Sequence, residues 1–340
     1  MNNQKKAKEN LRKNIVPFEK SNTKASVLQL INTMVPFVVL WFLAYLSLSV
    51  SYWLTLAIAI PTAGLLVRIF IIFHDCCHQS FFSNRKANTI VGTITGILTF
   101  TPFHQWRYTH NVHHATNGKL DNRGVGDVWT MTVEEYVAAS RLKKLMYRLY
   151  RNPVCMFGIG PFYIFLIDYR FNRSGARMKE RLNTYLTNGG IAALIVGLSF
   201  LIGWQQFLLV HGPIFFFSAA AGIWLFYVQH QFEDSYFERN DKWDYIRAAV
   251  HGSSYYELPH VLRWMTGNIG YHHVHHLSPK LPNYHLQKVH TAIPDLQKVT
   301  TINLLTSLRS LHHRLWDEEN RTFVSFGELK RRERARKKAS

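Results

Sequence analysis

One stretch decides the fold of this chain: Ser51–His78, SYWLTLAIAIPTAGLLVRIFIIFHDCCH, joins an apolar run to a histidine cluster. The apolar part contains Arg68 as its only Lys or Arg, and it is long enough to cross a bilayer as a helix. The run just before it, Val27–Val50, carries no charge and has a similar length. Together the two runs predict a membrane-spanning helical hairpin over residues 27–73 that ends next to His74.

A second pair of apolar runs, Gly189–Val210 and Gly212–Phe232, predicts another hairpin with its outer turn at His211. Two other runs, Ala87–Phe103 and Val154–Ile167, are too short to span and predict re-entrant or interfacial segments. We therefore expect an all-α integral membrane protein, with four transmembrane helices in two hairpins and a cytoplasmic helical cap that holds a histidine-rich di-metal site. Its single domain, 1–340, then comprises a basic cytoplasmic tail (1–24), the first hairpin (27–73), a cytoplasmic region with two histidine clusters (74–188), the second hairpin (189–232) and a cytoplasmic region with the third cluster and a basic tail (233–340).

Three histidine clusters have the spacings HxxxH, HxxHH and HxxHH, and each lies beside a hydrophobic segment. Residues three or four apart share one face of a helix, so we expect each cluster to point its rings at one place. Neutral imidazole is the commonest metal ligand near pH 7. Eight imidazoles are too many for one ion and suit two. The expected metal ligands and catalytic residues are His74, His78, His110, His113, His114, His272, His275 and His276.

A ninth histidine, His230, ends the fourth predicted span, which delivers it to the side of the clusters. We expect it to be an additional ligand. Asn268 lies four residues before His272 and is a further candidate, either directly or through water. His273 lies one residue off the shared face of its cluster and is left out. Interfacial, packing or surface roles are expected for the remaining histidines: His104, His211, His251, His260, His285, His290, His312 and His313.

The type and number of these ligands narrow the metal. Imidazole suits Fe, Zn, Cu and Ni. Zinc normally takes three or four protein ligands, whereas eight or nine histidines supply four or five per ion, nearer to the six-coordinate preference of iron with open positions for oxygen. The sequence lacks the Glu and Glu-x-x-His pairs of soluble di-iron bundles. Neutral ligands leave the charge of the ions uncompensated, so we expect carboxylates behind the rings. The candidates are Asp75, Asp127, Glu233 and Asp234.

The formal net charge of +19 points to an anionic partner. Its placement decides which one: every Lys and Arg except Arg68 lies on the side of the histidine clusters, and a basic tail, KRRERARKK, occupies Lys330–Lys338. Basic residues that flank membrane spans fit an anionic lipid surface better than a nucleic acid. The amphipathic stretch Val133–Arg151 is either a headgroup-plane helix or an ordinary packed helix. The positive-inside rule predicts a multi-pass cell-membrane protein with cytoplasmic termini and active site.

The histidine motifs resemble those of a known family. HDCCH at 74–78, THNVHH at 109–114 and GNIGYHHVHHLSPKLPNY at 267–284 are similar to the three histidine boxes of the membrane fatty acid desaturases. The resemblance runs from about Leu28 to Leu308 and is nearest to bacterial acyl-lipid desaturases that act on phospholipids, including their delta-5 members. It implies a non-haem di-iron enzyme that uses O2 and two electrons to introduce a cis double bond into an acyl chain. The family's boxes correspond to the eight clustered histidines here, and its additional histidine corresponds to His230.

One position departs from the family pattern: Cys77 stands where glycine is expected in H-D-C-G-H. Because Cys77 lies off the face shared by His74 and His78, it is expected to fill space or to be a site of oxidation. The chain has only two other cysteines, Cys76 and Cys155, and no CxxC pair, so neither a disulfide framework nor a zinc motif of that kind is indicated.

The electrons must come from a separate carrier, because the sequence has no flavin or nicotinamide fingerprint and no fused haem domain. A basic cytoplasmic face is expected to attract an acidic ferredoxin or flavodoxin. An unactivated methylene offers no handle for acid–base chemistry, so the cofactor must perform the difficult step. The protein's tasks are then to hold two irons, exclude water and present one C–C bond of a membrane phospholipid.

Two other functions compete with this interpretation. A related di-iron hydroxylase or ketolase, acting on lipid, alkane or carotenoid, would use similar boxes, and box spacing does not separate the two outcomes. A metal transporter or sensor would carry polar residues through the interior of its spans, whereas the spans here are nearly all apolar. The mass of the product distinguishes a desaturase from a hydroxylase, because desaturation removes two hydrogens and hydroxylation adds an oxygen.

Overall fold

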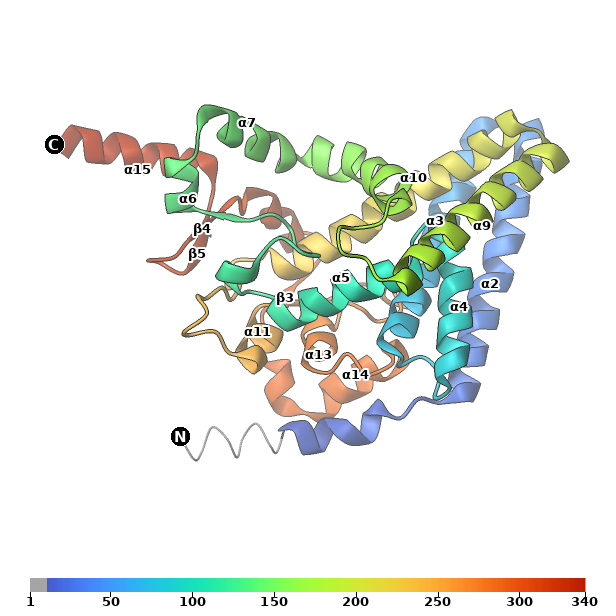
Figure 1. Ribbon diagram of the computed structural model, residues 1–340, viewed down its shortest axis with the longest axis horizontal. Coiled ribbons are helices and arrows are strands. Elements are labelled where there is room, and N and C mark those ends of the chain that lie inside the picture. Colours follow the sequence, from blue (N-terminus) through green and yellow to red (C-terminus); the bar gives the residue numbers. More distant parts are fainter. Residues whose placement is uncertain (1–10, 340) are drawn as a thin grey trace.

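The computed structural model describes residues 11–339, and this part of the chain is mostly helical. Four helices are long and apolar enough to cross a membrane: α2 (Thr23–Leu46, extended by η2, Ser47–Ser49), α3 (Tyr52–His78), α9 (Met178–Ile202) and α10 (Trp204–His230). α3 packs against both α2 and α10 through a shared apolar core. The predicted arrangement of four spanning helices in two hairpins is therefore confirmed (Figure 1).

The second hairpin is longer than predicted, and its turn lies elsewhere. It begins at Met178 rather than Gly189, because its first turns are helical although they are polar. The turn is at Gly203, whose φ of 92° is open to glycine but strained for other residues. His211 lies two turns inside α10 and is 8 % exposed. The prediction of an outer turn at His211 was wrong, since Pro213 does not interrupt this helix.

The first histidine cluster is followed by a helical hairpin of a different kind. α4 (Arg85–Leu98) packs along α3 and α9, and α5 (Phe103–Thr116) leads back to the histidines. Between them the chain reverses at Phe100, which has a φ of 58° and whose carbonyl accepts a hydrogen bond from Arg170. The run Ala87–Phe103 is therefore not one of the four long apolar helices; it ends in a turn that reverses the chain into α5.

Two segments expose apolar side chains away from the core. The stretch predicted as one amphipathic helix over Val133–Arg151 is divided into α6 (Val133–Ala138) and α7 (Arg141–Tyr150). The exposed apolar side chains of α7 are Leu142, Leu145, Met146 and Leu149. The second segment consists of η4 (Val154–Ile159), α8 (Gly160–Phe162), η5 (Tyr163–Ile167) and η6 (Asp168–Arg170), and it too is largely exposed. This exposure agrees with an interfacial position for both segments.

The remaining elements form a region that we call the cap, made of residues 79–177 and 231–339. Its helices include α11 (Tyr245–His251), α12 (His260–Met265), α13 (His272–Leu277), α14 (Asn283–Ala292) and the projecting α15 (Phe326–Ala339), with the short helices η3 (Leu120–Asn122), η7 (Pro294–Gln297) and η8 (Thr306–His312). The N-terminal η1 (Val16–Glu19) packs against α14 from outside this region. α13 and α14 lie beside the end of α3, where His275 meets His74 and Asn283 meets Asp75 (Figure 1).

Five short strands join parts of the cap that lie far apart in the sequence. β1 (Met131–Thr132), β4 (Leu315–Asp317) and β5 (Thr322–Val324) form a sheet of order β1-β4-β5, in which β4 is parallel to β1 and antiparallel to β5. β2 (Tyr255–Tyr256) and β3 (Thr301–Ile302) form a parallel pair. No strand was expected from the sequence, because segments of two or three residues carry no readable alternation.

Candidate metal centre

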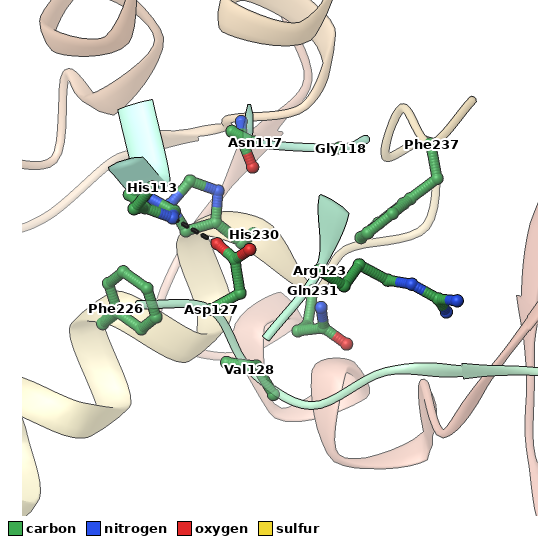
Figure 2. Close-up of a pocket in the computed structure, with 10 residues that line it drawn as sticks. All are labelled: His113, Asn117, Gly118, Arg123, Asp127, Val128, Phe226, His230, Gln231 and Phe237. Atoms are coloured by element: carbon green, nitrogen blue, oxygen red, sulfur yellow. Dashed lines mark hydrogen bonds and ion pairs between the residues drawn. The ribbon is translucent and has the colours of Figure 1, made fainter. Parts of the chain in front are cut away.

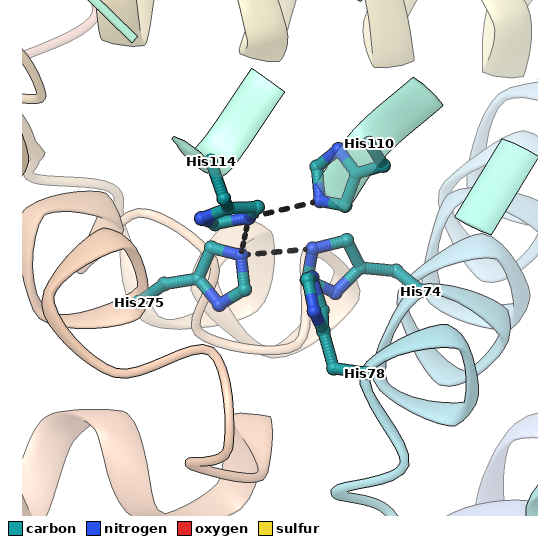
Figure 3. Close-up of side chains that lie close together, drawn as sticks. All are labelled: His74, His78, His110, His114 and His275. Atoms are coloured by element: carbon teal, nitrogen blue, oxygen red, sulfur yellow. Dashed lines mark hydrogen bonds between the residues drawn. The ribbon is translucent and has the colours of Figure 1, made fainter. Parts of the chain in front are cut away.

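Five histidines from three helices converge to form what we call the five-histidine group. His74 and His78 come from α3, His110 and His114 from α5, and His275 from α13. Their ligand nitrogens all lie within 4.8 Å of one another (Figure 3). All five rings except the half-buried His78 are buried. Segments separated by about 200 residues therefore deliver imidazoles to one point.

The ring nitrogens of this group face one another closely. Nε2 of His275 lies 3.0 Å from Nε2 of His74 and 3.0 Å from Nε2 of His114. Nε2 of His114 lies 3.1 Å from Nε2 of His110. Such a set of converging nitrogens is the donor arrangement of a metal site.

Four further histidines form the four-histidine group: His113 from α5, His230 from the end of α10, and His272 and His276 from α13. All four are buried. Nε2 of His230 is 3.2 Å from Nε2 of His113 and 2.9 Å from Nε2 of His272. Figure 2 shows His113 and His230 beside a small cavity that is also lined by Asp127 and Phe226.

The nine histidines singled out from the sequence are the nine that the structure brings together, but not cluster by cluster. Only His74 and His78 go to one group as a cluster. The second cluster sends His110 and His114 to the five-histidine group and His113 to the other, and the third is divided in the same manner. Neighbouring residues on a helix diverge by about 100°, so one HxxHH helix reaches two centres. The expectation that each cluster points at one place was wrong for these two.

Hydrogen bonds at Nδ1 of two rings determine which nitrogens carry lone pairs toward the centre of the four-histidine group. His230 Nδ1 lies 3.0 Å from the carbonyl of Gly252, which only accepts, so this nitrogen carries the hydrogen. His113 Nδ1 lies 2.5 Å from Asp127 Oδ1, a carboxylate oxygen that accepts, so Nδ1 of His113 also carries the hydrogen. The two Nε2 atoms, 3.2 Å apart, therefore face each other with lone pairs. A cation between them removes this repulsion, and the donor set fits a metal ion.

The same argument applies to the five-histidine group. His74 Nδ1 is 3.0 Å from Asp75 Oδ1, so its Nε2 presents a lone pair to His275. Nε2 of His78, and Nε2 of His276 in the four-histidine group, are buried without a hydrogen-bond partner among the described residues. Buried polar atoms without partners are costly in a folded protein. Coordination of a metal ion would give both atoms a partner.

Burial keeps the rings in the form that binds a metal. The pKa of His110, of His114 and of His275 is held well below its ordinary value, first by burial and then by neighbouring imidazoles. His272 and His276 of the four-histidine group show the same lowered pKa for the same reasons. At neutral pH these rings are uncharged, as metal coordination requires.

Two of the four carboxylates expected behind the histidines lie there. Asp75 is 1 % exposed and accepts from both the backbone N–H (2.6 Å) and the side-chain amide (2.8 Å) of Asn283 as well as contacting His74. Asp127 contacts His113. Glu233 and Asp234 were wrongly chosen: they are exposed in the turn after α10 and have no hydrogen bond to a site histidine within residues 11–339. Gln231 and Phe232 stay buried after His230, and the chain exposes Glu233 and Asp234 before Ser235 is buried again.

Several site neighbours were not identified from the sequence. Asn283 holds Asp75, and Trp106 stacks on His110 with ring centroids 4.2 Å apart. Tyr245 donates to the carbonyl of His276. The position of Trp106 one helical turn before His110 is the only available signal, because the other two contacts join distant segments.

The remaining candidates lie outside both groups. Asn268 donates to the carbonyl of Asn283 at 3.3 Å, so its side chain supports the region around Asp75 rather than a ligand position. His273 is fully buried but pairs with His290, 3.2 Å away, in agreement with its omission. Cys77 is buried against Phe103 and fills space off the histidine face. The other histidines assigned ordinary roles are also absent from the two groups within the described residues.

Comparison with known proteins identifies the family of this chain. The family model named fatty acid desaturase matches residues 50–301. The chain is 60 % identical over 320 residues to a fatty acid desaturase of Bacillus subtilis, covering 94 % of this chain and 91 % of that protein. It is 26 % identical over 303 residues to the sn-1 oleoyl-lipid 12-desaturase of Synechocystis, covering 84 % and 83 % respectively. The chain therefore belongs to the fatty acid desaturase family, a family of membrane oxidoreductases that act on lipids.

Proposed function

We propose that this chain is an O2-dependent, non-haem di-iron desaturase that introduces a cis double bond into acyl chains of membrane phospholipids. The observation that carries the proposal is the convergence of nine histidines, all buried except the half-buried His78, into groups of five and four at one end of four apolar helices. Each group is assigned one iron, so five histidines are the ligands of one ion and four are the ligands of the other. Five or four imidazoles per ion exceed the usual need of zinc and suit iron with open positions.

The bound irons would supply the oxidising chemistry that an unactivated methylene requires and that no side chain provides. In the overall reaction, O2, two electrons and two protons convert one CH2–CH2 unit into CH=CH and two waters. The chain's own residues hold the rings in place. Asp75, Asp127 and the Gly252 carbonyl keep the Nδ1 hydrogens of three rings and direct their Nε2 lone pairs inward. Aromatic packing by Trp106 excludes water from His110.

The electron donor in this proposal is a separate acidic protein, a ferredoxin or flavodoxin. The net charge of +19 supports an acidic partner, and the basic residues of α7 and α15 are largely exposed on the cap. Opposite charges accelerate association and make it sensitive to salt. The rate with such a donor is therefore expected to fall as ionic strength rises.

The orientation in the cell membrane is also part of the proposal. The basic cap and both chain ends are assigned to the cytoplasm, and the turns at Ser49 and Gly203 to the outside. In a Cys155→Ser background, cysteines at Ser49 and at the exposed Gln205 are expected to react with an impermeant maleimide in intact cells. Cysteines at the exposed Arg85 and Lys280 are expected to react only after lysis. Reaction at Lys280 in intact cells would invert the assignment.

Removing the metal should remove both activity and stability. Chelated protein is expected to lose activity, and anaerobic ferrous iron is expected to restore it at about two ions per chain. Because only the folded site binds, iron at about 100 times its Kd should stabilise the fold by about 2.7 kcal/mol per site. Metal analysis and thermal unfolding with and without iron measure this. One tightly bound zinc per chain, with activity independent of iron, contradicts the di-iron assignment.

Expression in a host that lacks unsaturated fatty acids tests the reaction itself. The intact chain is expected to produce phospholipids whose acyl chains have lost two hydrogens, with the double bond located by mass spectrometry. Acyl chains that instead gain one oxygen would identify a hydroxylase. Unchanged lipids, in the presence of a working donor and iron-loaded protein, would refute the proposed reaction.

A further inference from the structure

Arg68 is a cation in the interior of a membrane-spanning helix. It is the only Lys or Arg in α3 and is 6 % exposed. It precedes His74 by six residues, which corresponds to about 9 Å along the helix axis. A charged side chain at this depth is costly in a bilayer and marks a functional position.

The contacts of Arg68 leave part of its guanidinium open. Nε donates to Thr33 Oγ1 at 3.0 Å, Nη1 donates to the Trp264 carbonyl, and the guanidinium lies 4.2 Å from the centroid of the Trp264 ring. These partners are neutral, and within residues 11–339 no carboxylate forms an ion pair with Arg68. A guanidinium has five N–H donors. Nη2 has no hydrogen-bond partner among the described residues and is not sealed in the interior, although Arg68 as a whole is 6 % exposed, so its donors remain available.

A line of polar side chains leads from Arg68 toward the cap. Thr33 donates to the Gln29 carbonyl at 2.6 Å, and Gln29 donates to Asn283 Oδ1 at 3.0 Å. One turn earlier on α2, Ser26 lies 3.3 Å from the hydroxyl of Tyr284. Such a line is unusual in an otherwise apolar hairpin, and it ends where α2 meets α14.

A groove opens at that end of the line. It has a volume of about 520 Å³, and Tyr284, Asn268, Gln287, Lys288 and Thr291 line it. The ammonium of Lys288 and the side-chain amides of Gln287 and Asn268 are the donors available in the groove, because the hydroxyls of Tyr284 and Thr291 already donate to the carbonyls of Phe81 and Gln287. Oxygen atoms of a phosphodiester are acceptors that match this set. The hydroxyl of Tyr284 also accepts from the backbone N–H of Asn22, next to the start of α2, so the groove lies at the end of a spanning helix.

We propose that Arg68 and this groove together bind the polar end of the phospholipid substrate. Lys288 and its neighbours hold the phosphodiester, and the open Nη2 donors of Arg68 hold the ester oxygens at the head of the acyl chain. The inference rests on the proposed desaturase function. Its consequence is that the acyl chain is fixed at its ester end, beside the helix that carries His74. The carbon pair presented to the histidine groups is then set by distance from the ester.

The test uses full-length, iron-loaded protein in vesicles of phosphatidylglycerol with saturated acyl chains. Arg68→Met is expected to lower kcat/KM about 10-fold or more, as for loss of a hydrogen bond to a charged group, and to displace or scatter the double bond. Lys288→Ala is expected to raise KM several-fold while the double bond keeps its position. Lys280→Ala, a matched loss of an exposed lysine outside the groove, is expected to change neither value.

Arg170→Met controls for the general loss of a partly buried arginine, because Arg170 also binds a carbonyl, that of Phe100, but lies away from the groove. It is expected to keep the double-bond position. If Arg68→Met does not accumulate, Arg68→Lys decides the matter through a raised KM or a displaced double bond. An unchanged KM and an unchanged position overturn the lipid site. If the unaltered protein forms no double bond, the proposed function has failed instead.

Discussion

His230→Ala is expected to abolish desaturation while the protein still accumulates in the membrane. His230 is buried, and its Nε2 lies close to Nε2 of His113 and of His272. Removing this ring takes one of four ligands from its group, so the loss should exceed the about 10–100-fold that follows removal of an outer partner. Lipid analysis of cells expressing the variant, together with iron content of the purified protein, measures the effect.

His312→Ala is the matched control, because His312 is exposed at the end of η8 and lies outside both groups. It should leave activity and iron content near those of the unaltered protein. If His230→Ala desaturates normally, the four-histidine group does not require His230, and the assignment of a ninth ligand is wrong. Loss of activity in both variants would show that the effect does not depend on ligation.

Asp75→Asn and Asp127→Asn are each expected to lower activity about 10–100-fold, the usual consequence of losing an outer partner of a metal-binding histidine. Each carboxylate accepts a hydrogen bond from Nδ1–H of one ring and so fixes Nε2 as the nitrogen that faces the centre. The Asp75 variant should also be less stable, by about 1–3 kcal/mol, because an amide at this buried position cannot accept from His74 and Asn283 equally well. Steady-state rates and thermal unfolding separate the two effects.

Glu233→Gln supplies the comparison, since Glu233 is an exposed carboxylate near His230 in sequence. Its activity and stability should match those of the unaltered protein. Equal losses in all three variants would indicate a general response to charge rather than support of particular rings. Normal activity in Asp127→Asn would mean that His113 keeps its orientation without the carboxylate.

The sequence was sufficient to predict the features that depend on local periodicity. The apolar runs around Pro36 and Pro61 predict spanning helices, and the structure has both prolines inside such helices. The histidine spacing identified eight of the nine rings that converge, because helical geometry restricts where residues three and four apart can point. His230 was placed correctly for a different reason: a span that ends near the clusters must bring its last residues to them.

Features that depend on contacts between distant segments could not be predicted. Nothing near Asp127 distinguishes it from Glu233 in sequence, yet only Asp127 meets a site histidine, because the loop before β1 folds back over α5. The turn at Gly203 was missed because glycine and proline beside His211 also resemble a turn signal. The division of the HxxHH clusters between two groups depends on where α3 and α10 lie, which local spacing does not contain.

α5 and α13 each send histidines into both groups. An ion bound in the five-histidine group, as proposed, would immobilise two helices that also carry three of the four rings of the other group. The entropy lost in ordering those helices is lost once, so the second ion meets a site that is already arranged and binds more tightly than it would alone. The effect is reciprocal, whichever group fills first. If both groups bind iron as proposed, loading is expected to be cooperative, and the singly loaded species should be scarce at equilibrium.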